Sequence, residues 1–308
     1  MNELDPLDNW TLRTIPGITL SLRGTAFGNG KFMVDGLNGV IATSQYGDAW
    51  SVSVAPSTSS NNLFGAGFYN GKYIAVGRSI TGGRVSTSID AANWADTILP
   101  STRLNAVTYG ISNQGGGYVA VGDTSNAAYS PDLTTWTVED LSGITLPTGS
   151  DFRSAAFGIN TFVITGTNGG ILMTPDGLTW ARISLGNFPN LNGITFANGK
   201  FIAVGGNNTN GIIIASSDNG LTWPTQITVP GVIFRAVTYA NGFFVAAGSR
   251  GAIWSSPDGI NWSSRVSGIT GDLYGITFGR NTFLAVGDGG RILQSGVFDE
   301  HILRGVPF

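Results

Sequence analysis

The sequence contains no cysteine and a single histidine, His301, and only 11% of its 308 residues are charged. Without cysteine the chain forms no disulfide framework and carries no thiolate nucleophile. One histidine is too few for a metal site built from His and Cys ligands, and no Ser-His-Asp set can be assembled around that one residue. We therefore expect no metal, no cofactor and no catalytic site of these types.

A strong net charge and long apolar runs are also missing. The formal charge is −3, which provides no basic field for nucleic acid or for an anionic membrane. No window approaches the roughly 20 uninterrupted apolar residues that a membrane-spanning helix needs. The first residues, MNELDPLDNW, have neither the basic nor the apolar region of a signal peptide. We therefore expect no nucleic-acid binding, no membrane insertion and no signal peptide.

What the chain has in excess is glycine, 46 residues, and an internal repeat. A short run that ends in an aromatic residue, as in GITF, recurs seven times at intervals of 39 to 48 residues. Repeats of about 40–45 residues made of four strands are typical of propeller blades. The aromatic residues that mark the copies are Phe27, Phe68, Tyr109, Phe157, Phe196, Tyr239 and Phe278.

Within each copy the sequence signals strands only. Continuous apolar runs such as KFIAVG and GIIIASS, bounded by turns, fit strands that are buried on both faces. No segment shows a sustained helical period with caps. The predicted fold is all-β, a seven-bladed β-propeller of four-stranded antiparallel blades forming one domain over residues 1–308. Asn-Gly, which suits a type I′ hairpin turn, follows the first run at Asn29-Gly30, Asn70-Gly71, Asn198-Gly199 and Asn241-Gly242.

A propeller has to join its two ends. A tryptophan follows the turn between the third and fourth runs in six copies, but in the seventh copy that position is His301. The missing tryptophan is Trp10, which lies 17 residues before the first repeat aromatic. We therefore predict that the segment around Trp10 pairs with Arg291–Ser295 as the outer strand of the last blade and closes the ring.

This closure divides the chain into three parts. Residues 1–16 are the closing outer strand, residues 17–295 form the blades, and residues 296–308 are a C-terminal tail. Two roles for the tail stay open, because it either adds to the last blade or docks on a partner.

The turn before the fourth run carries a motif. Residues 216–223 read SSDNGLTW, and three shorter copies have Asp132, Asp176 and Asp258 in the same role. The motif resembles the Asp-box, or BNR repeat (Ser-X-Asp-X-Gly-X-X-Trp), of sialidases and of many other bacterial and viral propellers. Such an aspartate accepts hydrogen bonds from backbone N–H groups of its own turn, and the tryptophan covers the base of the blade. We predict a structural role for these aspartates and for the complete box of Ser216, Asp218, Gly220 and Trp223.

The resemblance to sialidases raises the question of glycosidase activity. It implies six blades, an arginine triad that grips the substrate carboxylate, a tyrosine nucleophile with a glutamate partner, and an aspartate acid/base. This sequence departs from that pattern, since it has seven copies, lacks the Arg-Ile-Pro signature near its start and has no glutamate at a repeat position. We therefore predict that the protein is not an enzyme.

A variable position lies four residues before each repeat aromatic residue. If the first run is the innermost strand of its blade, this position surrounds one mouth of the central channel. Arginine, asparagine and aromatic side chains there suit an anionic or hydroxyl-rich ligand. In the alternative, the arginines bond to neighbouring carbonyls or to Asp35, Asp123 and Asp288. The candidate ligand-binding residues are Arg23, Phe64, Asn105, Arg153, Asn192, Arg235 and Tyr274.

The loops expected on the same face are polar and uncharged for most of their length. They comprise residues 57–62, 124–128, 147–151 and 205–211, which are rich in Ser, Thr, Asn and Gly. Such loops suit adaptable hydrogen bonding at a recognition surface, and they are equally typical of ordinary solvated turns.

The few charges and the missing signal peptide resemble the propellers of phage virions. The leading hypothesis is a non-catalytic structural or receptor-binding component, a tail or decoration protein located in the virion or in the host cytoplasm before assembly. Its partners would be proteins, bound in part through residues 296–308, with a cell-surface glycan as a further candidate. The alternative is a carbohydrate-binding lectin. An assembly factor for a membrane complex, as some Asp-box propellers are, and a sialidase-type glycosidase are less favoured.

Overall fold

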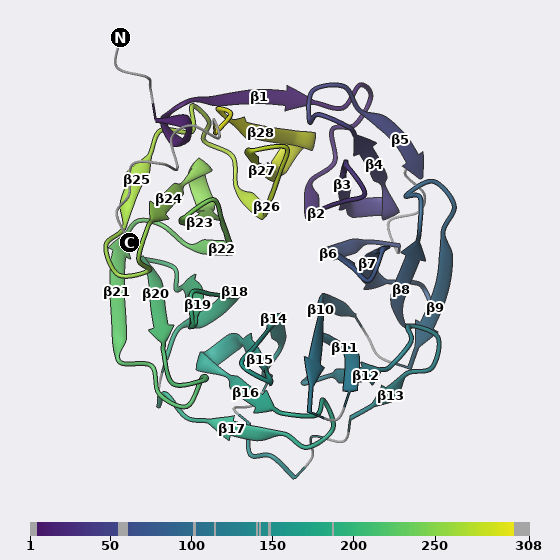
Figure 1. Ribbon diagram of the computed structural model, residues 1–308, viewed down its shortest axis with the longest axis vertical. Helices are drawn as coiled ribbons and strands as arrows, with labels where there is room; N and C mark the ends of the chain where they lie inside the picture. The colour runs from purple at the N-terminus through teal and green to yellow at the C-terminus, as the bar shows by residue number, and fades with distance from the viewer. Residues whose placement is uncertain are drawn as a thin grey trace.

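The computed structural model describes residues 5–54, 61–100, 103–113, 115–139, 141, 143–146, 149–186 and 188–298. In these residues, seven antiparallel sheets of four strands each stand around a central channel, as Figure 1 shows. The helical residues there are single 3-10 turns, and no helix of the described chain could cross a membrane. The predicted all-β, seven-bladed fold is confirmed.

The strands follow one another from the channel to the rim in each of the first six blades. Blades 1 and 2 are β2 (Leu22–Gly28), β3 (Lys31–Gly36), β4 (Ile41–Ser44), β5 (Ser51–Val54), β6 (Leu63–Tyr69), β7 (Lys72–Arg78), β8 (Gly83–Ser88) and β9 (Ala95–Leu99). Blades 3 and 4 are β10 (Leu104–Ser112), β11 (Gly115–Gly122), β12 (Ala127–Ser130), β13 (Thr137–Val138), β14 (Phe152–Gly158), β15 (Thr161–Gly166), β16 (Ile171–Thr174) and β17 (Ala181–Ile183).

Blade 7 takes its outer strand from the beginning of the chain. Blades 5 and 6 are β18 (Asn190–Ala197), β19 (Lys200–Gly206), β20 (Asn210–Ser216), β21 (Thr225–Pro230), β22 (Phe234–Ala240), β23 (Phe243–Gly248), β24 (Ile253–Ser256) and β25 (Ser263–Arg265). Blade 7 is β26 (Leu273–Gly279), β27 (Thr282–Gly287), β28 (Arg291–Ser295) and β1 (Trp10–Thr14). The 3-10 turns are η1 (Pro6–Asp8), η2 (Leu37–Gly39), η3 (Thr167–Gly169), η4 (Ser249–Gly251) and η5 (Asp288–Gly290).

The ring closes as predicted. Strand β1 pairs antiparallel with β28 from Trp10 opposite Ser295 to Thr14 opposite Arg291. In Figure 1 the purple β1 lies along the outside of the yellow β28. Upstream of β1, Leu7 is fully buried among residues of blades 6 and 7. The closing segment therefore packs into the core as well as completing the sheet.

The beginning of the predicted C-terminal tail also packs on the last blade. The N–H of Phe298 donates to the carbonyl of Asn281 at 2.8 Å, and its ring contacts Phe278 and Phe283 in blade 7 and Phe243 in blade 6. The side chain is only 6% exposed. The rest of the tail, residues 299–308, lies outside the described residues together with His301.

The core lies between neighbouring blades, because each second strand is buried on both faces. After Lys31 every residue of β3 is buried, and so is every residue of β15 and β27. Phe32 of blade 1 packs in one cluster with Leu284 and Val286 of blade 7. Each such fully buried apolar side chain contributes about 1.5–3 kcal/mol, which explains the continuous apolar runs in the sequence.

The Asp-box residues form hydrogen bonds within their own turns. Asp258 accepts from the backbone N–H groups of Ile260 and Asn261, both at 2.8 Å. In the complete box, Thr222 donates its hydroxyl and N–H to Asp218, and these bonds lower the pKa of Asp218 to about 2. The indole of Trp223 donates to the carbonyl of Gly220 at 3.0 Å. The copy TSIDAANW at residues 87–94, which lacks the glycine of the motif, has the same aspartate bonds, since Asp90 accepts from the N–H groups of Ala92 and Asn93.

We expect the replacement Asp258→Ala to lower the free energy of unfolding by about 1 kcal/mol, as the loss of a helix-capping aspartate does. The cause is the loss of the acceptor for two backbone N–H groups of the turn. Chemical denaturation at neutral pH measures the change. The matched control is Asp48→Ala in the first blade, because within the described residues Asp48 accepts from its neighbour Ala49 alone. An equal effect of both replacements would contradict the structural role of the box.

Candidate functional site

The seven candidate residues share one backbone feature. In every blade the pairing of the first two strands shifts register at one residue, for example between Leu22 and Gly24. A β-bulge of this kind leaves one residue unpaired and re-aims its side chain. The bulged residues are Arg23, Phe64, Asn105, Arg153, Asn192, Arg235 and Tyr274.

These bulges bring all seven side chains to one mouth of the channel, at the end where the innermost strands begin. Together with Arg103 they line a cavity of about 330 Å³, which we call the channel mouth. Arg103 lies just before β10 and outside the repeating run, so the periodic pattern did not select it. In the described residues the mouth thus contains four arginines, two aromatic rings and two asparagines.

Three of the four arginines at the mouth form ion pairs. Arg103 pairs with Asp123 at 3.1 Å, so this carboxylate binds an arginine outside the seven candidates. Arg235 pairs with Asp272 at 2.5 Å. For Arg153 the distance to the nearest carboxylate, Asp151, is 3.8 Å.

The two other carboxylates named from the sequence bond elsewhere. Asp288 accepts from the hydroxyl of Ser21 at 2.8 Å. Asp35 accepts from the N–H of Gly24 at 2.9 Å. Asp151 and Asp272 instead provide the partners that the sequence did not reveal, since both lie in connecting segments of variable length.

Aromatic rings support the guanidinium groups. The guanidinium carbon of Arg23 lies 3.7 Å from the ring centroid of Tyr274, and that of Arg235 lies 5.0 Å from the same centroid. Arg103 lies over Phe64 at 4.4 Å. Burial raises the pKa of the Tyr274 hydroxyl, so this ring is neutral at physiological pH. Stacking restricts each guanidinium to a plane and leaves its N–H edge for hydrogen bonds.

The two asparagines at the mouth connect neighbouring blades. The amide of Asn105 donates to the carbonyl of Phe152 in the next blade at 2.8 Å, and that of Asn192 donates to the carbonyl of Phe234 at 2.8 Å. Asn105 also donates to Asp123. Both side chains therefore have structural bonds, and the arginines carry more of the unused hydrogen-bonding capacity.

Buried donors without an acceptor gather at this mouth. The Nε atoms of Arg23, Arg153 and Arg235 are all buried and have no hydrogen-bond partner in the described structure. Most buried polar groups in proteins are paired, and an unpaired donor costs about 1–3 kcal/mol. Three such donors at one opening leave hydrogen-bonding capacity that the described residues do not use.

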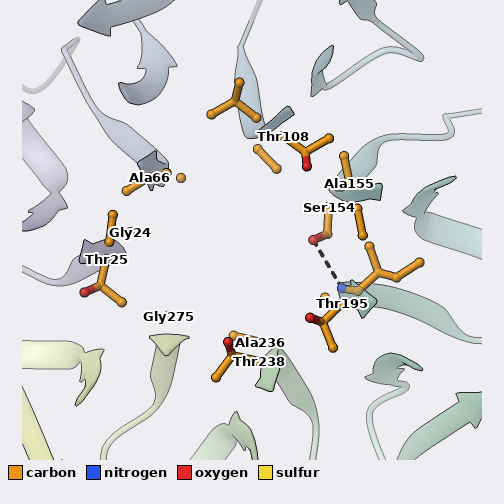
Figure 2. Close-up of a pocket in the computed structure, with 18 of the residues that line it drawn as sticks. Gly24, Thr25, Ala66, Thr108, Ser154, Ala155, Thr195, Ala236, Thr238 and Gly275 are labelled. Atoms are coloured by element: carbon orange, nitrogen blue, oxygen red, sulfur yellow. Dashed lines mark hydrogen bonds between the residues drawn. The ribbon is translucent and has the colours of Figure 1, made fainter. Parts of the chain in front are cut away.

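Below the mouth the channel is uncharged. The whole channel encloses about 510 Å³, and Arg23, Arg153 and Arg235 are the charged residues among those described along its wall. Figure 2 shows Thr25, Thr108, Thr195 and Thr238 arranged around this space. It also shows the hydroxyl of Ser154 accepting from the N–H of Ile194 in the next blade, at 3.2 Å. Positive charge is thus confined to one end of the channel.

One buried carboxylate lies directly behind the mouth. Asp35 is fully buried, and its second oxygen has no partner among the described residues. Burial raises the pKa of Asp35 to about 7, although the bond from Gly24 and the charge of Arg84 oppose the shift. The same register position in the other blades holds an uncharged residue, namely Val76, Val121, Thr165, Val204, Ala247 and Val286.

Metal binding has no support in this structure. Across the described ranges, no three His, Cys, Asp or Glu side chains are grouped so that they could hold a metal ion.

Of the polar loops expected on the mouth face, residues 57–60 and 147–148 lie outside the described part. The N–H of Thr124, in the loop after β11, donates to Asp151 at 2.9 Å.

Comparison with known proteins relates this chain to other propellers by structure alone. No protein-family model matches the sequence, and no curated protein matches it. The structure is similar to that of YCF48 bound to D1 peptide, with a TM-score of 0.71 and 16% identity over 96% of each chain. It is also similar to virginiamycin B lyase from Staphylococcus aureus, with a TM-score of 0.75 and 12% identity over 94% of this chain and 99% of that chain. A catalytically inactive histidine-to-alanine variant of that lyase, solved with quinupristin, has a TM-score of 0.74 and 12% identity over 94% of this chain and the whole of that chain. At these identities the similarity shows the propeller fold only.

Proposed function

We propose that this protein is a non-catalytic binding propeller that recognises a partner protein with its channel mouth. The observation that carries the proposal is the set of seven β-bulges, which aim seven side chains of differing type into one opening. The repeated backbone feature places a different set of side chains from each blade around one opening, so the rigid ring presents a specific surface there. Binding residues commonly lie on such variable positions held by a rigid framework.

The similar structures include a peptide complex and a lyase, and the residues of this chain favour the binding role. YCF48, whose solved complex contains D1 peptide, is a propeller of nearly the same extent. Virginiamycin B lyase becomes inactive when one histidine is replaced by alanine, whereas this chain has a single histidine, His301, in its last eight residues. The arginines at the mouth are suited to holding an acceptor group, and the nearby carboxylates Asp123, Asp151 and Asp272 pair with them.

Within this proposal the protein takes part in an assembly with other proteins. A factor that assists the assembly of a larger complex is one example of such a role. The location in a phage virion stays a prediction from composition, and so does the binding of a cell-surface glycan. Neither is needed for the binding surface described above.

The proposal predicts that blocking the mouth abolishes peptide binding. The chain has no cysteine, so a single introduced cysteine can be labelled without interference. Peptides are first selected on the unmodified protein from a library without charge bias. We then expect a bulky maleimide dye on the variant Phe64→Cys to weaken the selected peptides at least about tenfold, because the dye fills the mouth.

The matched control places the same dye on the opposite face. Ile89 is 70% exposed in the turn before β9, so labelled Ile89→Cys should bind the selected peptides as tightly as the unmodified protein does. Fluorescence anisotropy measures both affinities. Undiminished binding to the Phe64-labelled protein would refute the proposal, and a library from which no peptide is enriched would refute it as well.

A further inference from the structure

Among the arginines of the channel mouth, Arg23 is the one that no carboxylate balances. In the described residues its guanidinium forms no ion pair and its buried Nε–H has no acceptor, whereas Arg103 and Arg235 each pair with an aspartate. Positive charge with unused donors is therefore concentrated at blade 1 of the mouth.

The ring of Tyr274 holds this guanidinium in place. It lies between blades 6 and 1, with Arg23 at 3.7 Å from its centroid and Arg235 at 5.0 Å. An arginine stacked at this distance keeps its plane fixed, so Nε–H and one Nη–H point in a common direction. That edge is the part of arginine that binds two oxygens of one anion side by side.

Arg235 completes the arrangement without competing for the ligand. Its Nη2 is occupied by Asp272, so it is held in position and its charge is balanced. Two cations beside one ring repel each other, and in the described residues Arg235 forms an ion pair whereas Arg23 does not. An anion bound at Arg23 would relieve that repulsion and give the buried Nε an acceptor.

We propose that Arg23, stacked on Tyr274, is the anion site of this protein and that it binds one carboxylate of the partner, the side chain of an aspartate or glutamate. This inference rests on the proposed function, because it names the chemical group that the mouth recognises. Arg23 is the ligating residue, and Tyr274 is the positioning residue that restricts the plane of its guanidinium.

A singly charged carboxylate fits this site better than a phosphate group. Asp272 and Asp288 both lie close enough to affect the ionisation of groups in the cluster, Asp272 beside Arg235 and Asp288 beside Tyr274. Their negative charges oppose a dianion about twice as strongly as a monoanion. The uncharged channel below offers no further cation to a larger anion.

The test measures the affinity of a dye-labelled, blocked peptide of four glutamates and of its counterpart with four glutamines. We expect the glutamate peptide to bind at least about tenfold more tightly, and Arg23→Gln to remove that difference, since one charge-assisted bidentate contact is lost. The matched control is Arg280→Gln. Arg280 also lies over a tyrosine, at 5.1 Å from the ring centroid of Tyr46, but it belongs to the turn between β26 and β27 and does not line the mouth. Its replacement should leave the affinity for both peptides unchanged.

Two variants of Tyr274 separate positioning from folding. Tyr274→Phe keeps the ring and should keep the affinity for the glutamate peptide, whereas Tyr274→Leu should weaken it severalfold while the protein remains folded by circular dichroism. Acetate should displace the peptide at lower concentration than inorganic phosphate does. Equal affinity for the two peptides, an unaltered affinity of Arg23→Gln, or displacement by phosphate at the lower concentration would each overturn the inference.

The outcomes also separate this inference from the proposed function. If the library yields peptides that bind at the mouth but carry no acidic residue, the mouth is a protein-binding surface and the carboxylate site is wrong. If the glutamate peptide requires Arg23 but the library yields no peptide, the carboxylate site is right and the proposed function is wrong.

Discussion

Replacing Leu7 by alanine is expected to lower the free energy of unfolding by about 3 kcal/mol, the usual loss for a buried leucine in a core that cannot close the cavity. Leu7 is fully buried between blades 6 and 7, where it belongs to the same cluster as Leu273, Leu293 and Phe298. It therefore joins the two ends of the chain to the ring. Denaturation by urea, followed by tryptophan fluorescence, measures the change.

The matched control is Leu12→Ala in the closing strand β1. Leu12 is 48% exposed, so this replacement should change the stability by less than about 0.5 kcal/mol. Removing residues 1–14 altogether should be more severe, because β28 then becomes an exposed edge with unpaired backbone groups. We expect that shortened chain to aggregate in size-exclusion chromatography. Equal stability of Leu7→Ala and Leu12→Ala would contradict the closure described here.

The architecture was predictable because periodicity carries it. A repeat places the same residue at the same point of each blade, so the repeat aromatics gave the number of blades and Trp10 identified the closing strand. The buried second strands follow from the same logic, since a sheet packed on both faces needs continuous apolar residues. These features depend on the pattern of apolar residues alone.

The candidate site was predictable in position but not in its contacts. The seven candidate residues share a repeat position, but their residue types vary and do not predict a β-bulge. Arg103, Asp151 and Asp272 lie in connecting segments whose lengths differ from blade to blade. The repeat spacing therefore does not predict where these residues lie relative to the mouth. The ion pairs of the mouth are formed by these residues, which explains why the sequence named Asp288 and Asp35 as partners and the structure gives others.

The turn at residues 87–94 shows that an Asp-box can form without its glycine. The motif expects glycine where the backbone has positive φ, and there the chain has Ala91 with φ of 59°. Asp90 nevertheless accepts the same backbone N–H groups as the other box aspartates. The hydrogen bonds of the turn thus hold a backbone conformation that alanine disfavours, and the copy with Asp132 does the same with Leu133, whose φ is 72°.

Between pH 4 and pH 7 the stability of the protein should fall as the pH rises, and Asp35→Asn should remove most of that fall. The pKa of Asp35 is raised to about 7 in the folded protein by burial, whereas the unfolded chain has the ordinary value of 3.8. In this range the unfolded state has released the proton and the folded state still holds it. The folded state therefore binds more protons, and a rise in pH favours unfolding.

The size of the effect follows from the shift of about three pH units in this pKa, since each unit corresponds to 1.36 kcal/mol. The loss of stability between pH 4 and pH 7 is thus about 3 kcal/mol, and the rest of the effect follows above pH 7. The Asp-box carboxylates act in a different range. The pKa values of Asp132 and Asp218 are lowered to about 2 by hydrogen bonds, so the stability they contribute is lost only as the pH falls below about 4.

Urea denaturation at half-unit intervals from pH 4 to pH 8 measures the effect. Asparagine at position 35 retains an oxygen acceptor for the N–H of Gly24 but cannot ionise, so the stability of Asp35→Asn should be nearly constant across this range and exceed that of the natural protein at pH 8. The matched control, Asp48→Asn, removes the same charge from an exposed carboxylate and should follow the natural profile. A natural protein whose stability stays level or rises from pH 4 to pH 7 would show that Asp35 is ionised in the folded state, and that its burial is compensated by contacts stronger than the single bond from Gly24.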